Sequence, residues 1–597
     1  MKKSIKIKAA IMLMMTLTVF TACTNDDSLT LNPTDGSALV GNWTVDITGN
    51  SFPLWNYGPA LHMMSFQADG TGSFNTFYLM EEQPVARDYQ TFNYTATSDG
   101  HLTMEMEDGT FEYTYRFDDG QLTLSYQDNA KTYDKAGSSM TAKFDEWSSE
   151  ELIKVPNAAR YTIFVYGNAG GNMDYCIEES FWEEVKPLLT DSNNVRVVCF
   201  YKYGKDLPEE GKPFTGKYAE PGDIVWFELS SKTDLDKLRE NGAASIGFAE
   251  QAKQLKLCDP ASISSFLQLS SLICPAQEYI FTIWGHGNGF EPMYDIPGKY
   301  NKTVTRGLIS DQWNNNEKLD MYELVDAIRS TGAERLKMIF FHNSLMGNME
   351  SLTELRDVAE YIACSSHDLN SDYTVLPAFI RTLMEKDNVE QAFASMLSEV
   401  TPVWQNAYRD DKDGTTNGDL KLLRTSGLDS VINVSRRLAD RLVAIYPTQK
   451  EAIDIATKNV YRFITRYNDP VYSWANPFFD LQDYADKLAQ STGDADLQTI
   501  ADDLRMAFDK AILQSADINW SVQHLDHYSL SVCLYHQGFY NYDYVGAAGN
   551  PWNWNCNIGP GYEQSTFHKL TGWGNWLKIN TCQPWGNPTS GGGGLAE

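Results

Sequence analysis

The sequence predicts a multidomain protein: an antiparallel β-barrel or sandwich first, an α/β/α layer with a mostly parallel sheet second, and a mixed α+β region last. Three observations lead to this prediction. Apolar residues alternate with polar ones between residues 39 and 136, as in half-buried strands. From residue 161 onward, continuous apolar runs alternate with helical stretches. The chain of 597 residues is also long enough for several domains.

Residues 1–22 predict a lipoprotein signal peptide, because lysines precede an apolar run that is shorter than the roughly 20 residues needed to cross a bilayer. The segment Phe20-Thr21-Ala22-Cys23 resembles a bacterial lipobox, which implies lipidation of Cys23. Residues 23–37 then form a linker, in which Asp26-Asp27 resembles the surface-export signal of Bacteroidetes lipoproteins. We therefore expect a surface-exposed outer-membrane lipoprotein of a Gram-negative bacterium, attached to the membrane through its lipid.

Residues 38–145 predict the β domain. Asp-Gly pairs between alternating runs are the strongest short-range signal for hairpins, and several successive hairpins indicate an up-and-down barrel or sandwich. The opening Leu39–Trp43 resembles the start of lipocalin-like domains in Bacteroidetes lipoproteins. We expect a spacer filled by its own side chains, with ligand binding as the alternative. The Asp-Gly pairs are Asp69-Gly70, Asp99-Gly100, Asp108-Gly109 and Asp119-Gly120.

Residues 155–380 predict the α/β/α domain, because continuous apolar runs suit strands that are covered on both faces. Helices are expected at residues 262–273 and 321–330, the second capped by Asp320. Ligands of such sheets bind at the carboxyl ends of the strands. The predicted strands are residues 161–166, 195–201, 224–229, 279–284 and 336–341.

Polar residues follow two of these strands. The strand at residues 279–284 leads into Gly285-His286-Gly287, and the strand at residues 336–341 leads into His342-Asn343-Ser344. Glycines beside a histidine leave its ring accessible and allow backbone N–H groups to approach a substrate. These two strand ends are therefore the candidate functional site.

Several ordered motifs around these strand ends resemble the clostripain family of cysteine peptidases, which have a caspase-like fold. The resemblance implies that His286 is the catalytic histidine, that Ser344 occupies the position of the nucleophilic cysteine, and that backbone N–H groups at Gly287 and Ser344 hold the substrate carbonyl. It also implies that His342 replaces an acidic residue that helps to receive a basic side chain at the cleavage site. The matching segments are residues 161–173, Gly285–Gly287, Asp311, Leu319–Leu324, Leu345–Gly347 with Glu350, and residues 361–365.

Serine at position 344 leaves three hypotheses open. A cysteine thiol has a pKa near 8.5 and needs only a nearby histidine, whereas a serine hydroxyl needs a base that a third group holds in place. The first hypothesis is a pseudopeptidase that binds peptides or protein partners. The second is a hydrolase that uses Ser344 and His286, helped by His342. The third is an active cysteine peptidase trapped by substitution of its cysteine. Cys364 lies in an apolar run, so we expect it to be a buried structural residue.

Composition excludes some partners. The net charge of −31 disfavours binding to nucleic acid, which depends on Lys and Arg. The nine cysteines show no zinc-ligand spacing, so we expect no metal or other cofactor. One alternative is calcium at residues 410–414 with Asp419, although Thr416 and Leu422 occupy places where an EF-hand needs glycine and a ligand. Residues 381–597 predict a mixed region of helices and a few strands packed on the α/β domain, with a flexible tail from residue 590.

Overall fold

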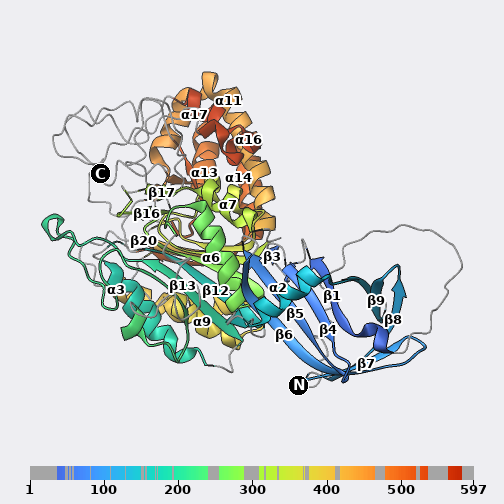
Figure 1. Ribbon diagram of the computed structural model, residues 1–597. Helices are drawn as coiled ribbons and strands as arrows, with labels where there is room; N and C mark the ends of the chain where they lie inside the picture. The colour runs from blue at the N-terminus through green and yellow to red at the C-terminus, as the bar shows by residue number, and fades with distance from the viewer. Residues whose placement is uncertain are drawn as a thin grey trace, which may run out of the picture. The chain divides into compact units, whose positions relative to one another are not determined.

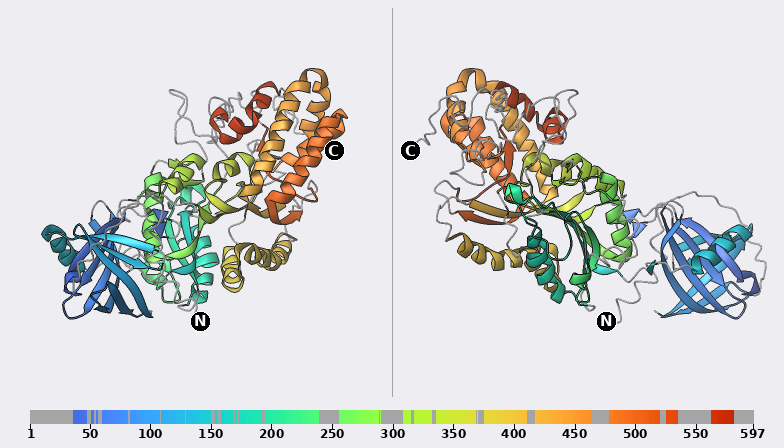
Figure 2. Two further views of the ribbon diagram at one scale, coloured as in Figure 1. Left: turned by 90° about the vertical axis from the view of Figure 1, so that its right-hand side faces the viewer. Right: turned by 60° about the vertical axis from the view of Figure 1, so that its left-hand side comes forward.

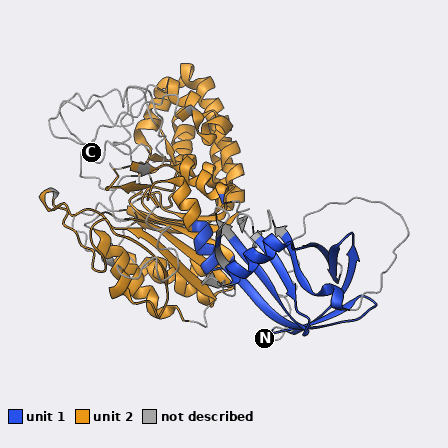
Figure 3. Cartoon of the chain, viewed as in Figure 1, with its two compact units in different colours: residues 1–158, 267–277, 331–334 blue, residues 159–266, 278–330, 335–597 orange. Residues whose placement is uncertain are grey.

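The computed structural model contains two compact units (Figure 3). One comprises Met1–Ala158, Leu267–Gln277 and Thr331–Glu334, and the other comprises Ala159–Phe266, Glu278–Ser330 and Arg335–Glu597. The structure describes residues 36–47, 51–52, 55–56, 60–80, 83–107, 109–127, 129–149, 153–154, 158–168, 170, 173–190, 194–238, 255–287, 289, 308–314, 317–331, 335–367, 369, 375–409, 417–463, 478–519, 525–534 and 562–580.

The first unit is a closed barrel of eight antiparallel strands (Figure 1). The order is β6-β5-β4-β1-β10-β9-β8-β7, and β7 pairs again with β6, which closes the sheet and decides for a barrel rather than a sandwich. Closure leaves no strand of the barrel with an unpaired edge. The strands are β1 (Gly41–Ile47), β4 (Ala60–Phe66), β5 (Thr71–Met80), β6 (Gln83–Ala96), β7 (His101–Met106), β8 (Gly109–Asp118), β9 (Gln121–Tyr126) and β10 (Asn129–Lys135).

Alternation along each strand divides the side chains between two faces. Met64 and Phe66 point into the barrel and belong to its core, together with Trp43 and aromatic residues of β8. Leu61 and Met63 point outward and pack with Trp147 of α2 (Ser138–Ser149). Three of the predicted Asp-Gly turns join β4 to β5, β6 to β7 and β8 to β9, and Asp108 of the fourth pair lies outside the described residues.

The second unit contains a mixed sheet of eight strands in the order β14-β13-β12-β15-β18-β19-β20-β22. Interior neighbours pair in parallel (β12 with β13, β15 with β18, and β18 with β19), whereas β14, β20 and β22 pair antiparallel at the two ends. The strands are β12 (Ala159–Asn168), β13 (Val195–Lys202), β14 (Ile224–Leu229), β15 (Ala276–Gly285), β18 (Leu336–His342), β19 (Ala359–Cys364), β20 (Asn417–Arg424) and β22 (Ile512–Asn519).

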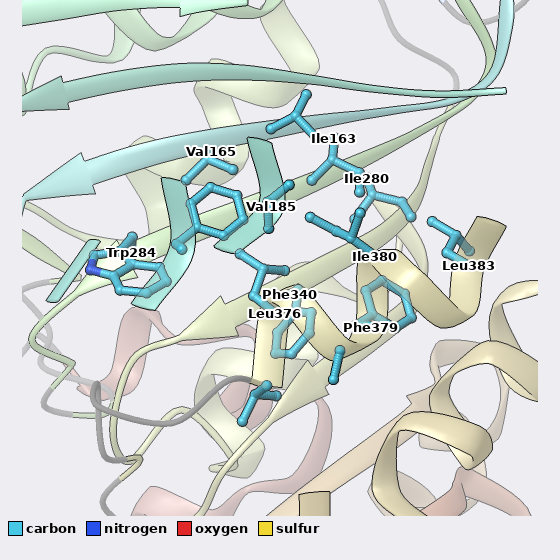
Figure 4. Packing of buried hydrophobic residues seen from close by; sticks show 14 of the residues in the cluster. Ile163, Val165, Val185, Ile280, Trp284, Phe340, Leu376, Phe379, Ile380 and Leu383 are labelled. Carbon is cyan, nitrogen blue, oxygen red and sulfur yellow. The ribbon is translucent and has the colours of Figure 1, made fainter. Parts of the chain in front are cut away.

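One face of this sheet packs against α9 (Val375–Glu385) and α10 (Val389–Arg409). Figure 4 shows Phe340 of β18 and Ile280 of β15 beside Phe379 and Ile380 of α9. The views in Figure 2 show the C-terminal helices lying alongside one another. These are α11 (Leu428–Asn459), α13 (Leu481–Thr492) and α14 (Ala495–Ala511). None of the helices that the structure describes is long and apolar enough to cross a membrane.

The predicted helix after Asp320 is confirmed as α7 (Met321–Ser330). Asp320 Oδ1 accepts from the Glu323 amide at 2.8 Å, and Glu323 Oε2 accepts from the Asp320 amide at 3.1 Å, a reciprocal capping box. The six cysteines in the described part of the chain are all buried.

Inside the barrel, His62 is buried and its Nδ1 lies 2.9 Å from Thr76 Oγ1. Burial, with a smaller effect from Lys131, lowers the pKa of His62 to about 3. Between pH 6.5 and 3 the unfolded chain therefore binds a proton that the folded barrel does not, and stability falls as the pH falls by about 1.4 kcal/mol per pH unit.

We expect amide protection factors in β4 and β5, corrected for intrinsic exchange, to fall about fiftyfold between pH 6.5 and 4.5 because of this histidine, which is already half protonated in the unfolded chain at pH 6.5. Hydrogen exchange followed by mass spectrometry measures them. The His62→Gln variant serves as the comparison, since it removes the titration. An equal loss of protection in both proteins would contradict the assignment.

Candidate functional site

The register of β15 on β18 brings the two predicted strand ends together. Trp284 pairs with His342 in a parallel ladder, and His286 and Ser344 each follow two residues later. His286 is exposed and Ser344 is partly exposed at this carboxyl edge of the sheet. The sequence-based expectation that the two residues lie at the same end of adjacent parallel strands is therefore confirmed, while their chemical roles stay predictions.

Gly287 packs directly on the backbone of Ser344. A Cβ atom at Gly287 would lie 2.2 Å from the Ser344 carbonyl oxygen and 2.9 Å from its nitrogen. Gly285 has φ of 151°, and a Cβ there would lie 2.4 Å from the Asn168 carbonyl oxygen. The glycines beside His286 therefore allow close approach of neighbouring strand ends, which is a packing requirement in addition to any role in binding.

Ser344 Oγ accepts a hydrogen bond from the backbone amide of Leu369, at 3.1 Å. Leu369 follows β19, the strand next to β18. An amide N–H only donates, so this contact occupies the serine oxygen without providing a base for its proton.

His342 is buried at the carboxyl end of β18, with its ring stacked on Trp284. The ring centroids are 3.9 Å apart and the planes differ by 2°. Burial lowers the pKa of His342 to about 4, so the ring is neutral at pH 7. The resemblance to a peptidase implies an acidic residue at this position, but His342 supplies neither a negative charge nor, at neutral pH, a positive one.

The turn after Ser344 is strained and firmly held. Leu345 has φ of 63°, which is unusual for a residue other than glycine. Its amide donates to the His367 carbonyl at 2.9 Å, and its carbonyl accepts from Asn348 Nδ2 at 2.9 Å. Asn348 also caps α8 (Met349–Leu355) through its Oδ1. The backbone that carries position 344 is therefore fixed from both sides.

A buried polar network that the sequence did not reveal lies beside this turn. His367 Nδ1 is 2.8 Å from Asp419 Oδ1, and His367 Nε2 is 3.0 Å from the Tyr461 hydroxyl. Lys421 pairs with the other carboxylate oxygen of Asp419. Burial opposes ionisation of Asp419, but Lys421 and His367 outweigh it and hold the pKa of that carboxyl well below its ordinary value.

This arrangement corrects the calcium alternative for Asp419. The side chain is fully buried on β20, and both of its oxygens accept hydrogen bonds from protein groups. Residues 410–416, which would supply the rest of such a loop, lie outside the described residues. Within the described part of the chain, no group of three or more His, Cys, Asp or Glu side chains could hold a metal ion.

Three buried polar atoms at this edge of the sheet have no hydrogen-bond partner among the described residues: Asn168 Nδ2, His342 Nε2 and Asn343 Oδ1. Such atoms are rare in folded proteins, because an unpaired buried polar atom is costly. Asn168 is the last residue of β12, His342 is the last residue of β18, and Asn343 follows it, close to Gly285 and Gly287. Water or a ligand bound at these strand ends would satisfy them.

Cys364 is confirmed as a buried residue, with burial raising the pKa of its thiol to about 12. It is therefore unsuited to act as a substitute nucleophile. The predicted lipidation site Cys23 and the tail from residue 590 lie outside the described residues.

The close packing at Gly287 gives a test of the site geometry. We expect Gly287→Ala to destabilise the second unit by about 3 kcal/mol or more, since the added methyl meets backbone rather than a movable side chain. Gly418→Ala is the matched control: its Cβ would meet Ile518 at 3.8 Å, an ordinary contact. Denaturant unfolding measures both, and a harmless Gly287→Ala would contradict this packing.

Known proteins were compared with this chain at the levels of sequence and fold. A solved structure of a secreted C11 cysteine protease from Bacteroides thetaiotaomicron, called iotapain, aligns at 14% identity with a TM-score of 0.46, covering 70% of this chain and 100% of that one. An inactive zymogen C11 protease from Parabacteroides distasonis aligns at 14% identity with a TM-score of 0.42, covering 70% and 99%. No curated relative matches. The sequence profile of the clostripain family, Peptidase_C11, matches residues 169–536, more than half of the chain, and this protein therefore belongs to the clostripain family.

Proposed function

We propose that this chain is a catalytically impaired member of the clostripain family that binds peptides or protein partners at the strand ends carrying His286 and Ser344. The observation that carries the proposal is serine at position 344, beside the histidine of the neighbouring strand. A serine hydroxyl requires a hydrogen-bonded base to become a nucleophile. Here the described hydrogen bond of Ser344 Oγ comes from the Leu369 amide, which cannot accept a proton.

Features that favour binding are retained at the same edge. Gly287 keeps the backbones of the two strand ends in close contact. His286 is exposed and Ser344 is partly exposed, so an imidazole and a hydroxyl are accessible at these strand ends. A peptide backbone carries both donors and acceptors and so matches a site of this composition. Neutral His342 disfavours the charge pairing that a basic side chain would need.

A second candidate function is peptide hydrolysis by a Ser344–His286 pair. The register of β15 and β18 supports it, because the two residues occupy equivalent places on adjacent strands. In apo structures, catalytic hydrogen bonds often form only once substrate is bound. Peptide binding and peptide hydrolysis would therefore use the same strand ends, and only catalytic turnover distinguishes them.

Turnover is tested with a mixed library of fluorogenic peptides. We expect the natural chain to show no cleavage that disappears in His286→Ala. The Ser344→Cys variant should gain His286-dependent cleavage of at least a hundredfold over the natural chain, because a thiol is a few per cent ionised at pH 7. Cleavage by the natural chain that His286→Ala abolishes would establish the hydrolase instead.

Binding is tested by equilibrium dialysis of the same peptide pool, with bound peptides identified by mass spectrometry. Peptides retained by the natural chain should be retained at least tenfold less well by His286→Gln. His527→Gln is the matched control, since His527 is an exposed histidine outside these strand ends. Equal retention by all three proteins would show that peptides bind elsewhere.

A further inference from the structure

We propose that the backbone amide of Leu369 is an anion-stabilising donor aimed at position 344, and that buried Asp419 is the positioning residue that holds this amide in place. The proposal deepens the proposed function, because it concerns the same residue 344. It adds Leu369, which no sequence motif identified, and it gives Asp419, a calcium-ligand candidate in the sequence, a different role.

The first step is the direct contact. Leu369 N lies 3.1 Å from Ser344 Oγ and donates to it. Backbone amides aimed at an oxygen or sulfur stabilise negative charge there. With a cysteine at position 344, this amide would favour the thiolate. With serine at this position, it occupies a lone pair of the oxygen, and the O–H can still donate to a ligand.

Asp419 holds the segment that follows β19. Asp419 Oδ1 accepts from Ser365 Oγ at 3.0 Å, from the Ser366 amide at 3.0 Å and from the His367 amide at 2.9 Å. Hydrogen bonds to an ionised carboxylate are shorter and stronger than neutral ones. Lys421 keeps this carboxylate ionised although it is fully buried. One side chain thus fixes three consecutive residues, and Leu369 follows two residues later.

The segment after β19 also contacts the strained turn at Leu345. The His367 carbonyl accepts from the Leu345 amide, and the His367 ring is held between Asp419 and Tyr461. Leu345 also packs with Tyr461, Phe463 and Tyr528 in a small apolar cluster. Asp419 therefore acts on both sides of the nucleophile position: on its side chain through Leu369, and on its backbone through His367 and Leu345.

The ionisable groups around position 344 must be separated in any pH measurement. Among the described residues they belong to five elements: His286 after β15, His342 on β18, Glu350 on α8, His367 after β19, and Asp419 with Lys421 on β20. Glu350 is occupied by the Cys533 amide and the Tyr562 hydroxyl. His286 is the group whose charge must be controlled, since it is the exposed one.

The experiment measures the pKa of a cysteine placed at position 344. In full-length Ser344→Cys protein, the rate of alkylation of Cys at position 344 by iodoacetamide is followed against pH by peptide mass spectrometry. Two variants of this protein are compared. One also carries Leu369→Pro, which removes the amide hydrogen, and the control carries Leu369→Ala, which keeps it. Both are repeated with His286→Ala, so that the histidine contributes nothing to the difference.

We expect the thiol pKa to lie below 8.5 with Leu369→Ala and to rise by at least one unit with Leu369→Pro, in both histidine backgrounds. Equal pKa values for the two Leu369 variants would overturn the role of the amide. Neither result depends on peptide binding or cleavage, so a failure of this proposal is distinct from a failure of the proposed function.

The positioning role of Asp419 is tested by Asp419→Asn with Lys421→Met, which removes both buried charges together. This pair should raise the thiol pKa, and Leu369→Pro should then add no further shift, because both changes act through one amide. Additive shifts, or no shift from the pair, would overturn that role. If the pair does not fold, Ser365→Ala removes one donor to Asp419; a smaller rise supports the role and an unchanged pKa overturns it.

Discussion

The parallel pairing of β15 with β18 is the constraint on which the site depends. A slip of one residue in this register would turn alternate side chains to the opposite face and separate the strand ends. The stacked rings of Trp284 and His342 occupy the last paired position of the ladder and resist such a slip. Beyond that position, contact between Gly287 and the Ser344 backbone is possible because no Cβ stands between them.

The buried charges beside this edge serve geometry rather than stability. A buried ion pair such as Asp419–Lys421 seldom stabilises a fold more than apolar side chains of the same size would. Its value here lies in the number of donors that a single ionised carboxylate gathers from the segment after β19. The strained backbone at Leu345 likewise serves geometry. A residue keeps an unfavourable φ only where the surrounding contacts hold its backbone in that conformation.

The sequence predicted the strands and helices that carry ordinary burial patterns. β14 and α7 have the predicted bounds, because a run of apolar residues broken only by Glu228 and a capping pair leave little ambiguity. The direction of β14 was not evident, since a run of apolar residues does not specify its partner. β20 escaped notice for a physical reason: Asp419 and Lys421 interrupt its apolar pattern and are buried only because they neutralise each other. His367 likewise lacks flanking glycines, and its partner Asp419 lies 52 residues away.

Burial shields the thiols of the described cysteines from reagents in the solvent. Oxidants and exchanging disulfides attack thiolates that they can reach, and burial denies them both access and ionisation. These thiols are therefore poorly placed for oxidation or disulfide exchange while the fold is intact.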